Sequence, residues 1–147
     1  MNAGPRPHAR DFGALNLNSR SLALLACSAL REKQGFDPVI LDIRKLTAIA
    51  DYFVLVHGNS QRHVRTLSDT TLEWLGAKKV EPGHVEGLNE ARWVLLDYGS
   101  VIVHVFHRDT RAFYNLERLW GEAKTVRVTE SISNEKRHPK ARRSSPP

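Results

Sequence analysis

The stretch from Trp93 to His107 constrains the fold more than any other part of this 147-residue chain. Its two halves, 93–98 and 101–107, are short runs rich in residues that favour β-strands, and Gly99-Ser100 separates them. A two-residue connection containing glycine suits a tight turn between antiparallel strands. We therefore predict a β-hairpin. In its first strand, Val94, Leu96 and Tyr98 face one way, and the other face carries Trp93, Leu95, Asp97 and Gly99.

Further segments have the composition of strands or the apolar spacing of helices. We expect strands at 38–43 and 52–58 with a connector at 44–51 between them, and a loop at 78–87 that allows one short strand. Helices are expected at 19–34, from Gln61 to about Gly76, and from about Asp109 to Ala123. This order predicts an α/β fold, a mixed β-sheet with helices packed on it.

Each expected helix has an apolar stripe that would face the core. The stripes are Leu22, Leu25, Ala26, Ala29 and Leu30; Val64, Leu67, Thr71 and Leu75; and Phe113, Leu116 and Trp120. Ser19 is the expected N-cap of the first helix and Gly35 its stop, while Gly58-Asn59-Ser60 ends a strand and caps the second helix.

Length and charge divide the chain into one domain with two extensions. A 41% hydrophobic content supports one core, which we place in residues 18–123, after a disordered lead-in at 1–17 and before a basic disordered tail at 124–147. Residues 18–120 carry a net charge of only +1, whereas residues 121–147 carry +4. Such a tail commonly contacts polyanions, although solubility and plain disorder explain it equally well.

Neither a membrane span nor a disulfide is expected. No apolar run approaches the roughly 18 residues that a spanning helix needs. The single cysteine, Cys27, lies in an apolar helical stretch, where a free thiol usually packs as a small hydrophobic group.

The strongest candidates for catalysis are Asp97 and His104. A nucleophilic triad also needs a serine or cysteine on a sharp turn, and the chain contains no G-x-S-x-G sequence. His104 lies between Ile102 and Phe106 on one strand face, where a partly buried histidine is more common than a general base. His104 and His107 are three positions apart and would point to opposite faces, so we expect no metal site from that pair.

The turn "HGNS" at residues 57–60 is a second candidate site. Nucleotidyltransferases open their active sites with a similar turn, but they also need carboxylates two residues apart on one strand to hold magnesium ions. No acidic pair with that spacing occurs anywhere in the chain. We therefore interpret the turn as a helix cap and predict no catalytic residues, no metal and no cofactor.

Three segments resemble the ribosomal silencing factor family, RsfS, also called Iojap. They are "DYFVLVHGNSQRHVRTLSD", "VEGLNEARWVLLDYGSVIVHVF" and "RAFYNLERLW", and the resemblance extends over about 100 of the 147 residues. Its specific elements are Asp51-Tyr52, Gly58-x-Ser60, Glu86-Gly87, Trp93, Leu96-Asp97-Tyr98-Gly99, His104, Tyr114, Leu116-Glu117 and Leu119-Trp120. Two positions depart from the family pattern: His57 stands where a small residue is usual, and Ser100 where aspartate is frequent.

The resemblance implies a binding protein with a nucleotidyltransferase-like fold that lacks the catalytic carboxylates. Family members bind the large ribosomal subunit through ribosomal protein L fourteen, block subunit joining sterically and lower translation when nutrients are scarce. The resemblance further implies a cytoplasmic bacterial protein, with a mitochondrial or chloroplast location as the alternative, and it allows a homodimer. A cryptic nucleotidyltransferase and a direct RNA-binding protein, with the tail contacting rRNA, stay open as alternative hypotheses.

We expect the partner to bind the 93–99 strand and its surroundings. The expected contact residues are Trp93, Leu95, Asp97, Tyr98, Gly99, Asp51 and Tyr52. Trp93 and Asp97 are the expected anchors, because aromatic side chains and desolvated charges dominate many protein interfaces. For Trp93 and Tyr98, packing in the core is the alternative that the sequence leaves open.

Overall fold

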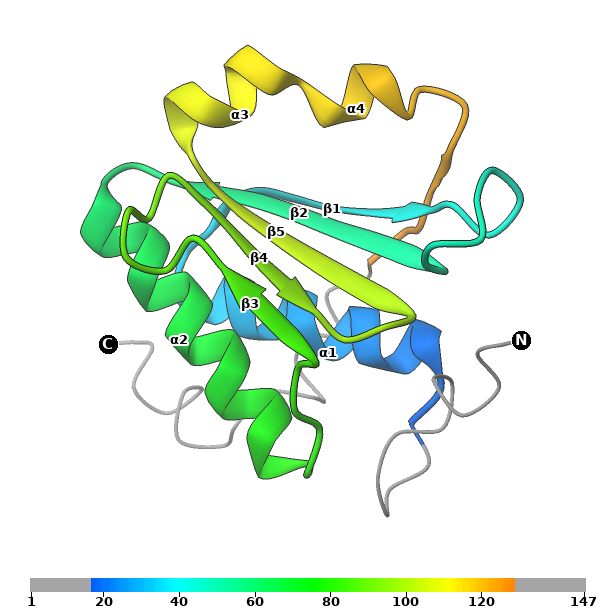
Figure 1. Cartoon of the computed structure of the whole chain (residues 1–147), viewed down its shortest axis with the longest axis horizontal. Coiled ribbons are helices and arrows are strands. Elements are labelled where there is room, and N and C mark those ends of the chain that lie inside the picture. Colours follow the sequence, from blue (N-terminus) through cyan, green and yellow to red (C-terminus); the bar gives the residue numbers. More distant parts are fainter. Residues whose placement is uncertain (1–16, 129–147) are drawn as a thin grey trace.

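The structure, a computed structural model, describes residues 17–128 (Figure 1). Its helices are α1 (Ser19–Glu32), α2 (Gln61–Ala77), α3 (Arg108–Tyr114) and α4 (Leu116–Leu119). Its strands are β1 (Phe36–Asp42), β2 (Tyr52–Gly58), β3 (His84–Glu86), β4 (Trp93–Asp97), β5 (Val101–His107) and β6 (Lys124–Thr125). No helix in this part of the chain is long and apolar enough to cross a membrane.

All six strands form one sheet in the order β3-β4-β5-β2-β1-β6. β2 and β5 run parallel, and every other neighbouring pair is antiparallel, which confirms the predicted mixed α/β fold. The predicted hairpin is confirmed as β4 and β5, with Trp93 opposite Phe106 and Asp97 opposite Ile102. Gly99 has a φ of 88° in its turn, a conformation that favours glycine.

The main core lies between the sheet and the pair α1 and α2, which cover one face together (Figure 1). The predicted stripes of both helices are buried, including Leu22 and Leu30 on α1 and Leu67 and Leu75 on α2. The N-cap of α1 differs from the prediction of Ser19. Asn18 caps α1, because its Oδ1 accepts a hydrogen bond of 2.8 Å from the Ser21 N–H, and Ser19 is the first helical residue.

The other face of the sheet carries the short helices α3 and α4, at the top of Figure 1. The single helix predicted from Asp109 to Ala123 is wrong, because Asn115 takes a left-handed conformation with a φ of 48° and separates two short helices. Leu116 is buried and Trp120 packs on Phe53, as expected, with ring centroids 5.3 Å apart. Phe113, which was expected in the core, is 80% exposed.

Residues 124–128, assigned to the tail from the sequence, belong to the fold. β6 pairs with β1, Val126 is buried, and its N–H donates to the Ile40 carbonyl over 2.8 Å. At the other end, Leu17 packs against the main core, although it was placed in the lead-in. The rest of the predicted lead-in and tail, 1–16 and 129–147, lies outside the described residues.

Candidate partner-binding face

β4 has one buried side and one accessible side, as the alternation of its sequence predicts. Val94 and Leu96 are fully buried in the main core, whereas Trp93, Leu95 and Asp97 are only partly buried on the opposite side. These three side chains share the sheet face on which α3 and α4 lie. They are therefore the predicted contact residues of β4 that a partner could reach.

Trp93 joins this strand to α3 through a group of aromatic rings. Its ring centroid lies 5.1 Å from that of Phe106 and 5.0 Å from that of Tyr114, and Tyr114 in turn lies 4.9 Å from Phe113. Tyr114 is 53% exposed and Phe113 80% exposed. We call Trp93, Leu95, Asp97, Phe113 and Tyr114 the β4–α3 face.

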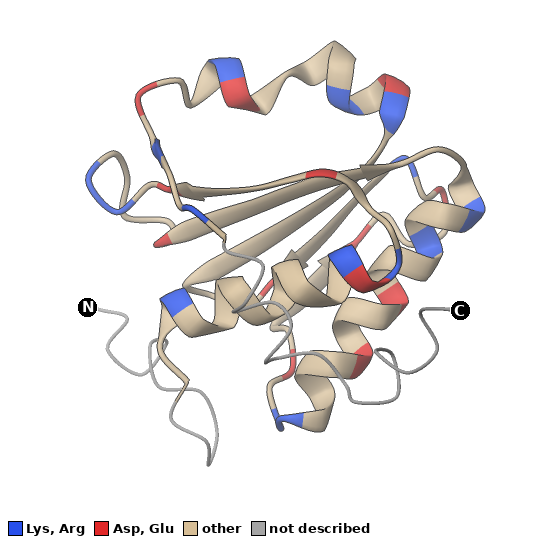
Figure 2. Cartoon of the chain, turned by 180° about the vertical axis from the view of Figure 1, so that it is seen from behind, with Lys and Arg blue, Asp and Glu red and all other residues tan. Residues whose placement is uncertain are grey.

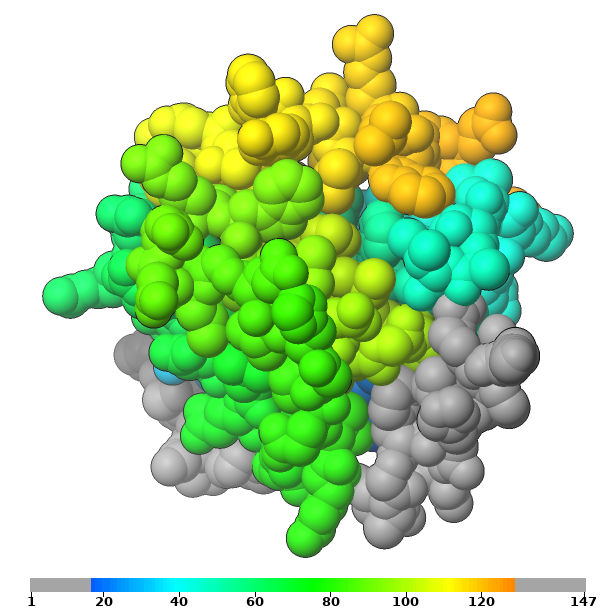
Figure 3. All heavy atoms as spheres, viewed as in Figure 1, coloured from blue at the N-terminus to red at the C-terminus, as the bar shows by residue number. Residues whose placement is uncertain are grey.

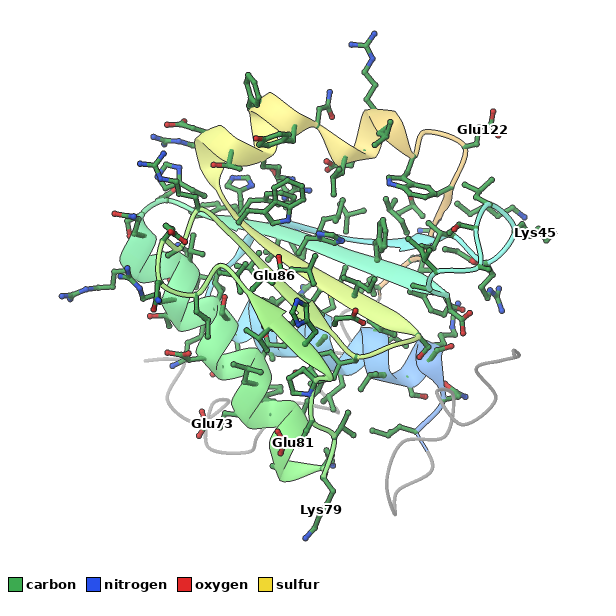
Figure 4. All side chains as sticks on the ribbon, in the orientation of Figure 1. Lys45, Glu73, Lys79, Glu81, Glu86 and Glu122 are labelled. Atoms are coloured by element: carbon green, nitrogen blue, oxygen red, sulfur yellow. The ribbon has the colours of Figure 1, made fainter. Side chains whose placement is uncertain are left out.

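The contact between the Trp93 and Tyr114 rings joins the two parts of the β4–α3 face. Figure 3 shows the lime surface around β4 adjoining the yellow surface of α3. Beneath it, side chains from both layers fill the space between α3 and the sheet (Figure 4). The edge strand β3 borders the face, with Glu86 opposite Leu95 and His84 opposite Asp97.

Asp97 has a local structural role as well as an accessible side chain. Its Oδ1 accepts a hydrogen bond of 2.8 Å from the Gly99 N–H and so fixes the turn between β4 and β5. Aspartate commonly binds its own backbone two residues ahead in this way. One carboxylate oxygen is thus used within the chain, which weakens the case for Asp97 as an anchor.

Three of the predicted contact residues are interior. Tyr98, Asp51 and Tyr52 are exposed by only 4%, 2% and 1%. Tyr98 and Tyr52 belong to the main core, and burial raises the pKa of Tyr98 well above its usual value. The Asp51 N–H donates to the Ser100 carbonyl over 2.7 Å and ties the start of β2 to the hairpin turn. Their side chains are buried and do not form part of the surface of the β4–α3 face.

His104 is a buried histidine, as the sequence suggests. It is 5% exposed, and its Nδ1 accepts a hydrogen bond of 3.1 Å from the Trp93 Nε1–H. Desolvation by burial lowers the pKa of the imidazole to about 4. The group is therefore neutral at physiological pH. Its Nε2 finds no hydrogen-bond partner among residues 17–128, so only one ring nitrogen has its hydrogen bond there.

The turn at residues 57–60 caps α2, as predicted. The Ser60 Oγ accepts from the His63 N–H over 3.0 Å, and the His63 Nδ1 accepts from the Asn59 N–H over 3.2 Å. Within residues 17–128, no group of three or more histidine, cysteine or acidic side chains could hold a metal ion. Cys27 is buried, and burial raises the pKa of its thiol to about 11.

Arg111 organises the short helices, a role that sequence reasoning missed. Its guanidinium is almost fully buried, donates to the Phe36 carbonyl over 3.2 Å and to the His57 Nδ1 over 3.1 Å, and pairs with Glu117. It thereby ties α3 to α4 and to the ends of β1 and β2. Burial and the neighbouring Arg111 charge lower the pKa of His57. A cleft of about 540 Å³ borders this cluster.

Gly87 shapes the approach to Trp93. It has a φ of 88°, and a side chain there would collide with the Trp93 carbonyl. Only glycine allows the chain to pass so close to β4 at this point. This contact gives a physical reason for the Glu86-Gly87 element of the sequence, beside the border strand β3.

The site therefore has the form of an accessible aromatic surface on a mixed α/β domain, and comparison with known proteins gives the family. A model of the family described as "Ribosomal silencing factor during starvation" matches residues 16–146. The ribosomal silencing factor RsfS of Halalkalibacterium halodurans is 40% identical over 117 residues, 80% of this chain and 100% of that protein. RsfS of Bacillus subtilis is 40% identical over 107 residues, 73% of this chain and 91% of that protein.

Solved structures agree with this assignment. A crystal structure of a protein from Chromobacterium violaceum superposes with a TM-score of 0.70 at 33% identity, covering 71% of this chain and 88% of that one. The mouse protein named "Mitochondrial assembly of ribosomal large subunit protein 1" is more distant, at 25% identity over 82% of this chain and 58% of that protein. The chain belongs to the ribosomal silencing factor family, which confirms the resemblance seen in its motifs and connects it with ribosome silencing.

Proposed function

We propose that this protein silences ribosomes by binding the large subunit through ribosomal protein L fourteen, on the surface that meets the small subunit. The bound domain then blocks subunit joining sterically and represses translation under nutrient limitation. Such a block requires affinity and bulk in the right place and no bond chemistry. The observation that carries the proposal, beside family membership, is the exposed aromatic surface of the β4–α3 face.

The β4–α3 face has the composition of a protein interface. Interface cores are enriched in aromatic side chains and depleted of charge, and a few such residues provide most of the binding energy. Phe113 and Tyr114 are exposed, and Trp93 lies beside them with Leu95 further along the strand. Asp97 stands at the polar margin of this surface.

The charge distribution favours a protein partner for the folded part. Residues 18–120 carry a net charge of +1, and Figure 2 shows acidic and basic segments interspersed over that side of the chain. Binding to RNA depends mainly on a concentration of positive charge. We assign any rRNA contact to the basic residues 121–147, as a salt-sensitive addition that does not determine the site.

The relatives favour a bacterial protein acting in the cytoplasm. Two relatives that are 40% identical over 80% and 73% of this chain are bacterial RsfS proteins, whereas the mouse mitochondrial protein is 25% identical. A homodimer is compatible with the proposal only if it leaves the β4–α3 face accessible. The nucleotidyltransferase alternative gains no support from Ser60, whose side chain caps α2.

Co-sedimentation with isolated subunits tests the proposal. We expect the purified protein to sediment with large subunits and not with small ones, and to reduce formation of joined ribosomes when it is added before the small subunit. In the same experiment, the protein should not sediment with large subunits that lack ribosomal protein L fourteen. Equal binding to both subunits, or binding that leaves joining unchanged, would contradict the proposal.

A further inference from the structure

We infer that His104 is the positioning residue of the β4–α3 face, where its Nδ1 holds the Trp93 indole in the orientation that the partner binds. The inference rests on the proposed function, because it gives Trp93 a role in binding. His104 is only 5% exposed, so it would act on the partner through Trp93 and not by direct contact.

The strand register brings the two side chains together. His104 lies opposite Leu95, and Phe106 lies opposite Trp93, so His104 and Trp93 are diagonal neighbours on one sheet face. Their ring centroids are 6.1 Å apart, and the indole Nε1 lies 3.1 Å from Nδ1. An indole nitrogen can only donate, so the histidine nitrogen that receives this bond carries no proton.

The imidazole itself is held from two other sides. The Phe53 ring meets it edge-on with centroids 4.7 Å apart, and the Phe106 ring is stacked parallel to it at 6.1 Å. Both phenylalanines are buried, so the position of Nδ1 is fixed by the core. The core thereby determines the orientation of the Trp93 side chain, which is only partly buried.

Stability alone does not account for a histidine at this position. With Nδ1 accepting, the proton of the neutral ring resides on Nε2, and this buried donor has no partner among the described residues. An unsatisfied buried donor is destabilising, and an apolar ring would avoid that cost. Within residues 17–128, the only hydrogen bond of the His104 side chain is the one to Trp93, and this bond is the role we assign to the imidazole.

Holding Trp93 in advance strengthens binding in a definite way. A large surface side chain that is free to change rotamer loses that freedom when a partner binds, and a pre-oriented one has already lost it. Loss of the bond should therefore weaken binding by about threefold to tenfold. The effect should appear in the affinity while the site of binding stays the same.

The test compares two replacements in the full chain. His104→Phe keeps a ring and removes the acceptor, whereas the amide oxygen of His104→Asn can take the position of Nδ1. We expect the Trp93 indole proton, assigned in NMR spectra by its loss in Trp93→Phe, to exchange with solvent faster in His104→Phe. Binding to large subunits should fall by about threefold to tenfold in that variant and stay within about twofold of the parent in His104→Asn.

A double replacement separates positioning from a general effect on the fold. In the Trp93→Phe background there is no indole N–H, so His104→Phe should weaken binding no further. An equal loss in both backgrounds, or unchanged binding by His104→Phe, would overturn the inference. If His104→Phe does not fold, His104→Gln replaces it, because its amide extends to the position of Nε2 and leaves Trp93 without its acceptor.

The indole exchange measurement needs no ribosome and keeps the two proposals distinguishable. If Trp93→Ala binds large subunits like the parent, the role of His104 in binding is overturned together with the proposed face. If Trp93→Ala loses binding but the indole proton exchanges equally fast in the parent and in His104→Phe, only the inference about His104 is overturned.

Discussion

The two faces of the sheet are covered to very different extents. On one face, α1 and α2, with 14 and 17 residues, enclose a core in which Leu22, Leu67 and Val103 have no exposed surface. On the other face, α3 and α4 have only 7 and 4 residues and leave Phe113 and Tyr114 largely exposed. The closed face provides most of the stability, and the half-open face has aromatic surface available for a partner.

The largest expected effect is a loss of stability on the closed face. Leu67→Ala removes a fully buried side chain of α2 and should lower the free energy of unfolding by about 2–5 kcal/mol. Urea denaturation measures this change, with Ile49→Ala as a control because Ile49 is 57% exposed. A loss below about 1 kcal/mol for Leu67→Ala would show that this core is less tightly packed than the structure indicates.

Acid should destabilise the other face through His104. Its pKa is about 4 in the folded chain and 6.5 ordinarily, so as the pH falls from 6.5 to 4 the unfolded chain binds the proton first. The contribution of neutral His104 to stability is present above pH 6.5 and is lost as the pH falls toward 4. The free energy of unfolding should decrease by up to about 3 kcal/mol over this range. Urea denaturation over this pH range should show a smaller decrease for His104→Asn than for the parent. Equal decreases in both would contradict a buried neutral histidine.

The connection between α3 and α4 gives a smaller effect. Glu117→Gln removes the charge that pairs with buried Arg111, while the partly exposed glutamate has some solvent screening. We expect a loss of about 1–2 kcal/mol, with faster amide hydrogen exchange in α3 than in α2. The control is Glu86→Gln, whose exposed pair with His84 should contribute little. Uniform acceleration of exchange in both helices would mean that the half-open face is not a separate unit.

The smallest expected change in stability is at the exposed aromatic residue. Phe113→Ala should leave the free energy of unfolding within about 0.5 kcal/mol of the parent, because Phe113 is 80% exposed. Urea denaturation measures it beside Leu67→Ala. A loss as large as that of Leu67→Ala would place Phe113 in the core, as the sequence first suggested.

Much of the closed face could be predicted from the sequence. The alternation in β4, the stripes of α1 and α2 and the cap at Ser60 all follow from local patterns, and the structure confirms them. These features are predictable because an apolar period of two or of 3.6 residues has one main structural meaning.

The half-open face was harder to predict, because its features depend on distant or single residues. The apolar spacing of residues 109–123 continues through Asn115, whose left-handed conformation ends α3. Asparagine tolerates that conformation, so a signal existed but was weak. The burial of Arg111 depends on Phe36, 75 residues away, and on His57, 54 residues away. The family motif includes Tyr98, Tyr52 and Asp51. A motif, however, does not distinguish a residue that contacts a partner from one in the interior.

The most direct test of the account measures large-subunit binding and thermal stability together for matched exposed residues. Phe113→Ala and Tyr114→Ala remove exposed rings from the β4–α3 face, and Ile49→Ala removes an exposed side chain from the β1–β2 connector. All three should melt like the parent, but only the two face variants should lose affinity, by about thirtyfold for a dominant residue. If both face variants bind and block joining like the parent, the β4–α3 face is not the ribosome-binding surface.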